Sequence, residues 1–142
     1  MGRVLGIDLG TKRVGVAVSD SARRVATPIE VVARSGDVGR DHRALRALVE
    51  EWEATVMVVG VPYSLDGSVG PAATAILAEI ETLRATIPVP VETYDERLST
   101  VTAERSLMRQ NLRAGERRRV VDMVAASVLL QGGLDAEASR GR

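Results

Sequence analysis

The sequence predicts an α/β domain in which three antiparallel strands are followed by alternating helices and buried strands. The first observation behind this prediction is a pair of short apolar runs at residues 4–9 and 14–18, joined by a turn at residues 10–13, which is the pattern of a hairpin. The second is the uninterrupted apolar run at residues 55–61, which is typical of a strand buried on both faces of a parallel sheet. Segments with apolar residues at helical spacing separate the later strands.

Length and composition bound the kind of protein. The 142 residues fit one domain, and a chain of this length buries roughly two-thirds of its extended surface. We expect the domain to span residues 1–135, followed by a disordered tail at residues 136–142. The chain has no Cys, which excludes disulfides, thiolate metal sites and cysteine nucleophiles. Without a signal segment or an apolar run near the ~18 residues that span a membrane, we expect a cytoplasmic protein with no membrane partner.

The first hairpin, Val4–Asp20, contains a carboxylate inside an apolar strand. Burying the ionised side chain of Asp8 is costly unless a cation or several donors meet it, so its position predicts a bound cation or a set of backbone donors. The alternative is that Asp8 caps the turn by bonding its own backbone. Gly6, Gly10 and Gly15 favour the first interpretation, because they let a ligand or another backbone come close to the carboxylate.

A third extended run, Val25–Ala33, is predicted at an edge of the sheet because Pro28 cannot donate to a ladder. After a polar loop at Ser35–Gly39, the segment Asp41–Trp52 has apolar residues at helical spacing and is predicted to cover one face of the sheet. His42 is the only histidine and has no metal-ligating residue at i+4. We therefore expect His42 to be solvated.

The buried strand predicted at Thr55–Val61 ends in a candidate loop at Pro62–Gly70. Pro71 then opens a helix that runs to Ala85, since proline is favoured at the first helical position. Backbone N–H groups at this helix start could hold a phosphate. The alternative is an ordinary connection between a strand and a helix, because a glycine-rich loop alone is weak evidence.

A further short strand at Val91–Tyr94 leads directly into two more carboxylates, Asp95 and Glu96. In open α/β sheets ligands bind at the carboxyl ends of strands, so these residues are well placed to join Asp8. The alternative is a surface ion pair with Arg97, a contact that typically contributes under about 1 kcal/mol. A helix is predicted at Val101–Met108.

The last segment combines a predicted mobile loop at Gln110–Glu116 with a helix at Val120–Leu130 that ends at Gly132-Gly133. Asp122 lies among apolar and small residues of this helix, which indicates that it points inward. The alternative is that Asp122 lies in the first helical turn and only favours the helix dipole, a contribution of ~0.3 to 1 kcal/mol.

Asp8, Glu96 and Asp122 together suggest a metal-dependent hydrolase. None of them is accompanied by Cys or a usable His, and ligation by oxygen alone selects hard cations such as Mg²⁺ or Mn²⁺. Held by a few carboxylates, such ions leave positions open for water and phosphate oxygens, which suits phosphodiester hydrolysis.

Four motifs that cover nearly the whole chain occur in the order GIDLGTKRVGVAVSD, VVGVPYSLDGS, YDERLST and VVDMVAASVLLQ. Together they resemble the YqgF/RuvX family of RNase H-like nucleases. The family is described as Holliday junction resolvases and as nucleases that trim the 5′ end of precursor 16S rRNA. The resemblance implies an RNase H-like fold whose five-stranded mixed sheet, with three antiparallel strands and then two parallel ones, is flanked by helices.

The resemblance also assigns roles to residues. It places the catalytic and metal-binding positions on Asp8, Glu96 and Asp122, with Asp20 and Asp95 as additional candidate ligands. Ser99 stands where the family usually has Thr, which affects no catalytic position. The expected partner is nucleic acid, as precursor rRNA or branched DNA, and a homodimer is allowed.

Positive charge is expected to hold the nucleic acid. Residues 104–119 contain six arginines and two acids in an otherwise neutral chain. The residues expected to contact nucleic acid are Lys12, Arg13, Arg97, Arg113, Arg117 and Arg118. The alternative is that this run of charge is only a solvated surface.

Two other functions are open at this stage. The motif GIDLGT by itself resembles the phosphate loop of actin-like ATPases and sugar kinases, but those proteins close two lobes around ATP and one domain of 142 residues offers no second lobe. The other is a catalytically silent factor that binds rRNA or assists ribosome assembly on the same fold, since a fold does not prove turnover.

Overall fold

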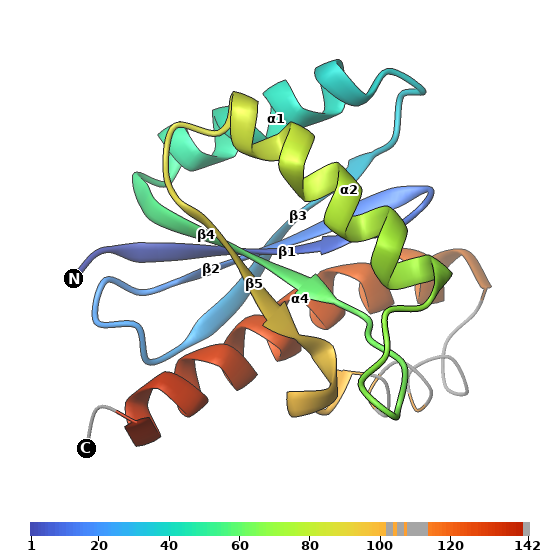
Figure 1. Ribbon diagram of the computed structural model, residues 1–142. Helices are drawn as coiled ribbons and strands as arrows, with labels where there is room; N and C mark the ends of the chain where they lie inside the picture. The colour runs from blue at the N-terminus through green and yellow to red at the C-terminus, as the bar shows by residue number, and fades with distance from the viewer. Residues whose placement is uncertain (102–103, 105–106, 108–113, 141–142) are drawn as a thin grey trace.

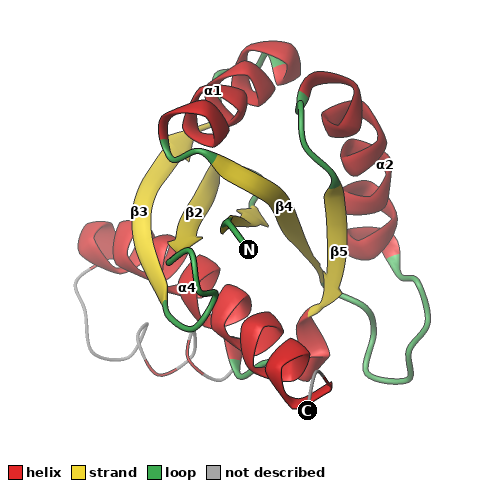
Figure 2. Cartoon of the chain, turned by 90° about the vertical axis from the view of Figure 1, so that its left-hand side faces the viewer, coloured by secondary structure: helices red, strands yellow, loops and turns green. Residues whose placement is uncertain are grey.

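The computed structural model describes residues 1–101, 104, 107 and 114–140, and in this part of the chain it shows a five-stranded mixed sheet. The elements in chain order are β1 (Arg3–Leu9), β2 (Arg13–Ser19), β3 (Ala26–Ala33), α1 (Val38–Glu51), β4 (Ala54–Val61), α2 (Pro71–Thr86), β5 (Val91–Asp95), the 3-10 helix η1 (Glu96–Leu98) and α4 (Ala114–Arg140). Helices α1 and α2 cover one face of the sheet and α4 crosses the other (Figure 1, Figure 2). The predicted fold class is confirmed.

The strand order β3-β2-β1-β4-β5 places β1 at the centre of the sheet. Strands β1, β2 and β3 pair antiparallel, as the hairpin pattern predicts, and β3 with its Pro28 lies at an edge. Strand β4 pairs parallel with both β1 and β5, which agrees with its continuous apolar sequence. The parallel pairs bring the carboxyl ends of β1, β4 and β5 to the same end of the sheet (Figure 1).

Helix α1 begins at Val38, earlier than the predicted start at Asp41. The Asp37 side chain accepts a hydrogen bond from the Arg40 amide at 3.2 Å, and this cap starts the helix inside the predicted loop. The prediction that His42 is solvated is wrong. Its side chain is 0% exposed, and Nε2 lies 2.8 Å from a carboxylate oxygen of Glu79 on α2, a partner that no spacing within α1 could indicate.

The final helix is longer than predicted at both ends. Residues 114–116, expected in a loop, are helical, while residues 110–113 lie outside the described part of the chain. The helix also continues through the predicted end at Gly132-Gly133 to Arg140, so the expected disorder is wrong for residues 136–140. Of the helix predicted at Val101–Met108, residues 101, 104 and 107 are helical and the others lie outside the description.

Close packing explains why the two glycines do not end α4. A Cβ on Gly132 would lie 3.0 Å from the Ser99 Cβ and 3.2 Å from the Tyr94 hydroxyl, and Gly133 faces the ring of Tyr94. Leu134 follows and is buried against the sheet, which rewards continuation of the helix. No helix in the described ranges is long and apolar enough to cross a membrane.

The two faces of the sheet carry cores of different kinds. The larger core lies between the sheet and the pair α1 and α2, and it is built from branched side chains such as Leu5, Ile7 and Val59. The smaller core lies under α4 and includes Ala17, Ala126 and Leu130. Small residues on this face let the α4 backbone come close to the strands.

Candidate active site

A cavity of about 290 Å³ opens where β1 ends and β2 begins. Its lining combines three acids, two cations and the turn between these strands. The lining residues are Asp8, Leu9, Gly10, Thr11, Lys12, Arg13, Pro62, Ile76, Glu96 and Asp122. The three acids predicted from the sequence therefore surround one hollow, although they come from β1, η1 and α4.

Asp8 lies near the end of β1 on the face that α4 covers. It pairs in register with Gly15 of β2, and its neighbours Ile7 and Leu9 point into the core on the opposite face. The Asp8 residue is 8% exposed. The central strand therefore holds this carboxylate in the lining of the cavity.

Glu96 reaches the cavity because the chain turns sharply after β5. The Asp95 side chain accepts a hydrogen bond from the Arg97 amide at 3.0 Å and so caps η1, which begins at Glu96. Glu96 is 7% exposed. A Cβ on Gly60 would lie 3.0 Å from Glu96 Oε1, so the glycine at the end of β4 leaves room for the carboxylate.

Asp122 approaches the other two acids because a glycine lets α4 touch β2. A Cβ on Gly15 would overlap with the Asp122 carbonyl oxygen, so any larger residue there would displace the helix at this point. The Asp122 carboxylate accepts a hydrogen bond from Arg13 Nε at 2.5 Å. Asp122 thus points inward as predicted and lies in the interior of the helix, beyond its first turn.

The donors fit a hard cation in chemical type but do not form a closed shell. All three side chains offer only carboxylate oxygens, which suit Mg²⁺ or Mn²⁺. Within the described ranges, no three side chains of Asp, Glu or His are grouped closely enough to hold a metal ion by themselves. A cation in this cavity would take part of its coordination from water or phosphate, as Mg²⁺ usually does.

Of the cations expected to contact nucleic acid, Lys12 and Arg13 line the cavity. Arg97 is held beside it, where Nη2 lies 2.6 Å from Asp95 Oδ2 and the guanidinium lies 5.9 Å from the ring centre of Tyr63. Hydrogen bonds from Arg97 lower the pKa of Asp95 below its usual value. Arg113 and the side chains of Arg117 and Arg118 lie outside the description.

The two additional ligand candidates have other partners. Asp20 accepts hydrogen bonds from the backbone amides of Arg24 and Val25 and so closes the turn between β2 and β3. That turn follows the end of β2 opposite to Arg13. Asp95 caps η1 and pairs with Arg97. Neither residue lines the cavity.

Sequence reasoning missed Arg34, which contacts the turn that lines the cavity. Its Nε donates to the Gly10 carbonyl at 3.0 Å. A usable signal was present, because an antiparallel third strand must end beside the start of the second. The pair Arg13 and Ala33 in the observed register shows this, and Arg34 is the next residue.

Comparison with solved structures places the fold in a known class. The protein resembles T. thermophilus RuvC in complex with a Holliday junction substrate, with a TM-score of 0.59, 19% identity and coverage of 96% of each chain. A second structure of Thermus thermophilus RuvC gives a TM-score of 0.56 at 18% identity, again over 96% of each chain. At this identity the similarity establishes the fold alone, which is RNase H-like.

Sequence relatives define the family more closely. Residues 2–136 match the RuvX family, described as Holliday junction resolvase. A relative from Cereibacter sphaeroides strain KD131 is 46% identical over 94% of this chain and 83% of its own, and one from Desulforamulus reducens is 39% identical over 96% and 98%. Both are named "Putative pre-16S rRNA nuclease". The chain belongs to the RuvX family, and it is a nuclease, a hydrolase that acts on nucleic acid.

Proposed function

We propose that Asp8, Glu96 and Asp122 bind Mg²⁺ or Mn²⁺ and catalyse hydrolysis of a phosphodiester bond in precursor 16S rRNA. The observation that carries this proposal is the cavity in which three acids from separate elements meet two cations, Lys12 and Arg13. Acids alone would repel a phosphate, and cations alone would bind it without a means to cleave it. The combination suits a reaction on an anionic substrate.

The division of labour follows from burial and position. When bound, the cation supplies charge stabilisation for the attacking and leaving oxygens of the phosphodiester. Asp8 and Glu96 suit a role as fixed ligands, because both are nearly buried, Asp8 in β1 and Glu96 at the start of η1. Asp122 approaches from α4 and completes the set of acids around the cavity.

Arg13 is suited to both the free and the substrate-bound site. Its Nε hydrogen bond to Asp122 offsets the mutual repulsion of the acids. In the described residues no hydrogen bond engages its Nη1 or Nη2 groups, which leaves the guanidinium fork for a phosphate oxygen. Lys12 on the same turn is exposed and adds a second positive charge at the cavity.

The choice of RNA rests on the relatives that are named as pre-16S rRNA nucleases. The aromatic residues Trp52, Tyr63 and Tyr94 do not line the cavity, so successive bases have no stacking platform there. Recognition through the phosphate backbone and shape follows. Branched DNA is the second candidate, because the family is described as Holliday junction resolvase and the RuvC neighbour was solved with such a junction.

We further propose that residues 1–135 form the nuclease domain, because every residue that lines the cavity, from Asp8 to Asp122, lies in this range. A precursor-rRNA substrate would place the protein in the cytoplasm. The predicted role of Arg113, Arg117 and Arg118 in holding the nucleic acid is kept as part of this proposal.

The test compares three end-labelled substrates in Mn²⁺: RNA with the 5′ extension of precursor 16S rRNA, DNA of the same sequence, and a four-way DNA junction. We expect cleavage of the RNA, and a loss of at least about 10³-fold in kcat for Asp8→Asn, Glu96→Gln or Asp122→Asn, because catalytic groups act as a unit. Asp20→Asn is the matched control, since it neutralises an acid far from the cavity, and it should cleave normally. EDTA should stop the reaction.

Two results would contradict the proposal. One is turnover by Asp8→Asn at the wild-type rate, and the other is full activity in excess chelator. RNA binding without cleavage of any substrate would instead favour the silent rRNA-binding factor. Cleavage of the junction alone would move the substrate to branched DNA. Unfolding of each acid variant must be measured beside cleavage. For Asp8→Asn and Glu96→Gln we expect apo stability to be unchanged or raised because repulsion between the acids falls. Asp122→Asn also weakens the ion pair with Arg13, so it is compared at matched folded fraction.

A further inference from the structure

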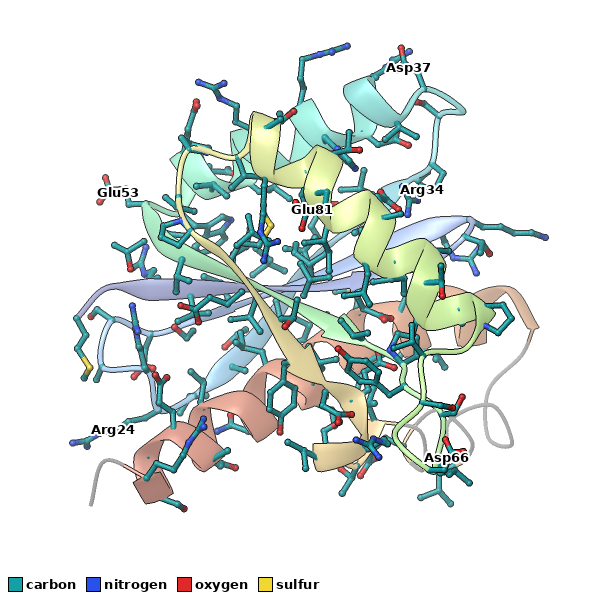
Figure 3. All side chains as sticks on the ribbon, viewed as in Figure 1. Arg24, Arg34, Asp37, Glu53, Asp66 and Glu81 are labelled. Atoms are coloured by element: carbon teal, nitrogen blue, oxygen red, sulfur yellow. The ribbon has the colours of Figure 1, made fainter. Side chains whose placement is uncertain are left out.

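Arg34 connects the cavity turn to the opposite layer of the protein. It follows the last residue of β3, and its side chain lies between α2 and the turn that joins β1 to β2 (Figure 3). Its Nε donates to the Gly10 carbonyl at 3.0 Å, and its backbone amide donates to the Lys12 carbonyl at 2.9 Å. One residue therefore holds two carbonyl groups of a turn whose residues Gly10, Thr11 and Lys12 all line the cavity.

The other edge of the Arg34 guanidinium is fixed by a carboxylate from α2. Nη1 and Nη2 lie 2.7 and 2.9 Å from the two oxygens of Glu79, which is the bidentate geometry of a strong ion pair. Glu79 Oε2 also lies 2.8 Å from Nε2 of the fully buried His42 on α1. The chain His42, Glu79, Arg34 thus runs from the core to the Gly10 carbonyl.

The charges in this chain stabilise one another. Hydrogen bonding to Glu79 raises the pKa of Arg34. Burial by itself would raise the pKa of Glu79, but the hydrogen bonds from Arg34 and His42 outweigh it and hold that pKa below its usual value. The side chains of Arg34 and Glu79 are only 16% and 18% exposed. Removing one member would leave a poorly solvated charge without its partner, so the network resists rearrangement.

We infer that Arg34 is a positioning residue for the nuclease site, and this inference rests on the proposed function of the cavity. By holding the Gly10 and Lys12 carbonyls it fixes the path of the chain between Asp8 and Arg13. Arg13 in turn holds Asp122. Arg34 therefore sets the spacing of Asp8 and Asp122, although it touches neither. Glu79 and His42 in turn fix the position of the Arg34 side chain.

The competing explanation is that Arg34 only fastens β3 to α2. Arg34→Lys separates the two roles, because a lysine keeps a positive charge near Glu79 but cannot donate to both carboxylate oxygens and to Gly10 in the same fixed geometry. Arg84→Lys is the matched control. Arg84 also donates through Nε and Nη2 to a carbonyl, that of Val91, and pairs with Glu81, but this contact lies at the start of β5, far from the cavity.

The experiment measures amide hydrogen exchange of the metal-free protein, Mn²⁺ affinity without substrate, and kcat. For Arg34→Lys we expect faster exchange confined to the peptide that covers residues 9–13, together with a loss of about 10- to 100-fold in Mn²⁺ affinity or kcat, the range for residues that orient ligands. Arg84→Lys should leave the exchange at residues 9–13, the Mn²⁺ affinity and kcat unchanged. Glu79→Gln should reproduce the effects of Arg34→Lys and replaces it if that variant does not fold.

Unchanged exchange at residues 9–13, or equally faster exchange throughout the protein, would overturn the inference. Normal kcat and Mn²⁺ affinity in a variant with a loosened turn would overturn it as well. Failure of the proposed function gives a different result. The wild type would then not cleave RNA, or Asp8→Asn would cleave it at the wild-type rate. In that case the exchange data still decide whether Arg34 holds the turn.

Discussion

The two faces of the sheet are stabilised in opposite ways, and β1 shows both. Leu5, Ile7 and Leu9 point toward α1 and α2 and fill space with branched side chains. Gly6 and Asp8, the residues between them, point toward α4, where a Cβ on Gly6 would lie 2.7 Å from the Leu130 Cβ. One face therefore depends on side-chain volume, and the other depends on its absence.

This contrast between the faces explains why the acids gather under α4. A thick apolar layer keeps a helix away from the strands, so a carboxylate on that helix could not approach one on the sheet. On the face under α4, Gly15 of β2 has no side chain, so the helix backbone at Asp122 lies directly against this strand. Gly15 is also the residue that pairs with Asp8 of β1. The face of the sheet under α4 is thus the place where residues far apart in the sequence can share a cavity.

The largest effect on stability is expected in the core between the sheet and helices α1 and α2. Leu5→Ala removes a side chain that is 0% exposed, and we expect a loss of about 2–5 kcal/mol in the free energy of unfolding, measured in urea. Because Leu5 lies at the start of β1 and faces away from the cavity, kcat at saturating substrate should change little in the folded protein. A loss below about 1 kcal/mol would mean that volume does not hold this face.

On the face of the sheet under α4, the addition of one methyl group should lower both stability and activity. Gly15→Ala places a Cβ against the Asp122 carbonyl, and we expect about 1–3 kcal/mol of destabilisation from overpacking, with a fall in kcat because Asp122 is displaced. Gly6→Ala is the matched control, since it overpacks the same helix at Leu130, away from the cavity. Equal kcat in the two variants would show that the helix does not position Asp122.

The smallest effect on stability is expected from the polar network of His42, Glu79 and Arg34, on the side of the sheet that α1 and α2 cover. The pKa of Glu79 is lowered from its ordinary 4.5, so its contribution to stability is present above that pH and is lost as the pH falls through the folded-state pKa. Glu79→Gln should therefore be less stable than wild type at pH 7, and the difference in unfolding free energy should shrink below about pH 4.5.

Glu50→Gln is the control for this titration, because Glu50 forms an exposed ion pair with Arg46. Its difference from wild type should be small at every pH. A difference for Glu79→Gln that stays constant between pH 7 and pH 3 would show that the carboxylate is not stabilised by its charge.

Local patterns carried most of the fold. The alternation around residues 4–18 and the apolar run at 55–61 gave the right strands because burial of one or both faces leaves a direct mark on the sequence. The same local logic failed at Gly132-Gly133. Glycine is typical of a helix end, but here it accommodates Tyr94 and Ser99, which only the folded chain brings near.

The cavity was predictable to a similar degree. Carboxylates at strand ends, or among the apolar residues of a helix, can be recognised from the sequence, and Asp8, Glu96 and Asp122 do line one hollow. The polar network behind it was not predicted, because Glu79 meets His42 across 37 positions and two helices. A lone histidine and a glutamate on separate amphipathic helices look like ordinary surface residues until the helices pack together.

Strand register has a consequence for how activity arises during folding. Side chains in β1 alternate with a period of two, so a slip of one residue against β2 would turn Asp8 into the apolar core and Ile7 toward the cavity. Such a hairpin would pay both for a buried charge and for an exposed branched side chain. Correct pairing of the central strand and assembly of the acids around the cavity are therefore one event, and a misregistered chain has no partially formed version of this cavity.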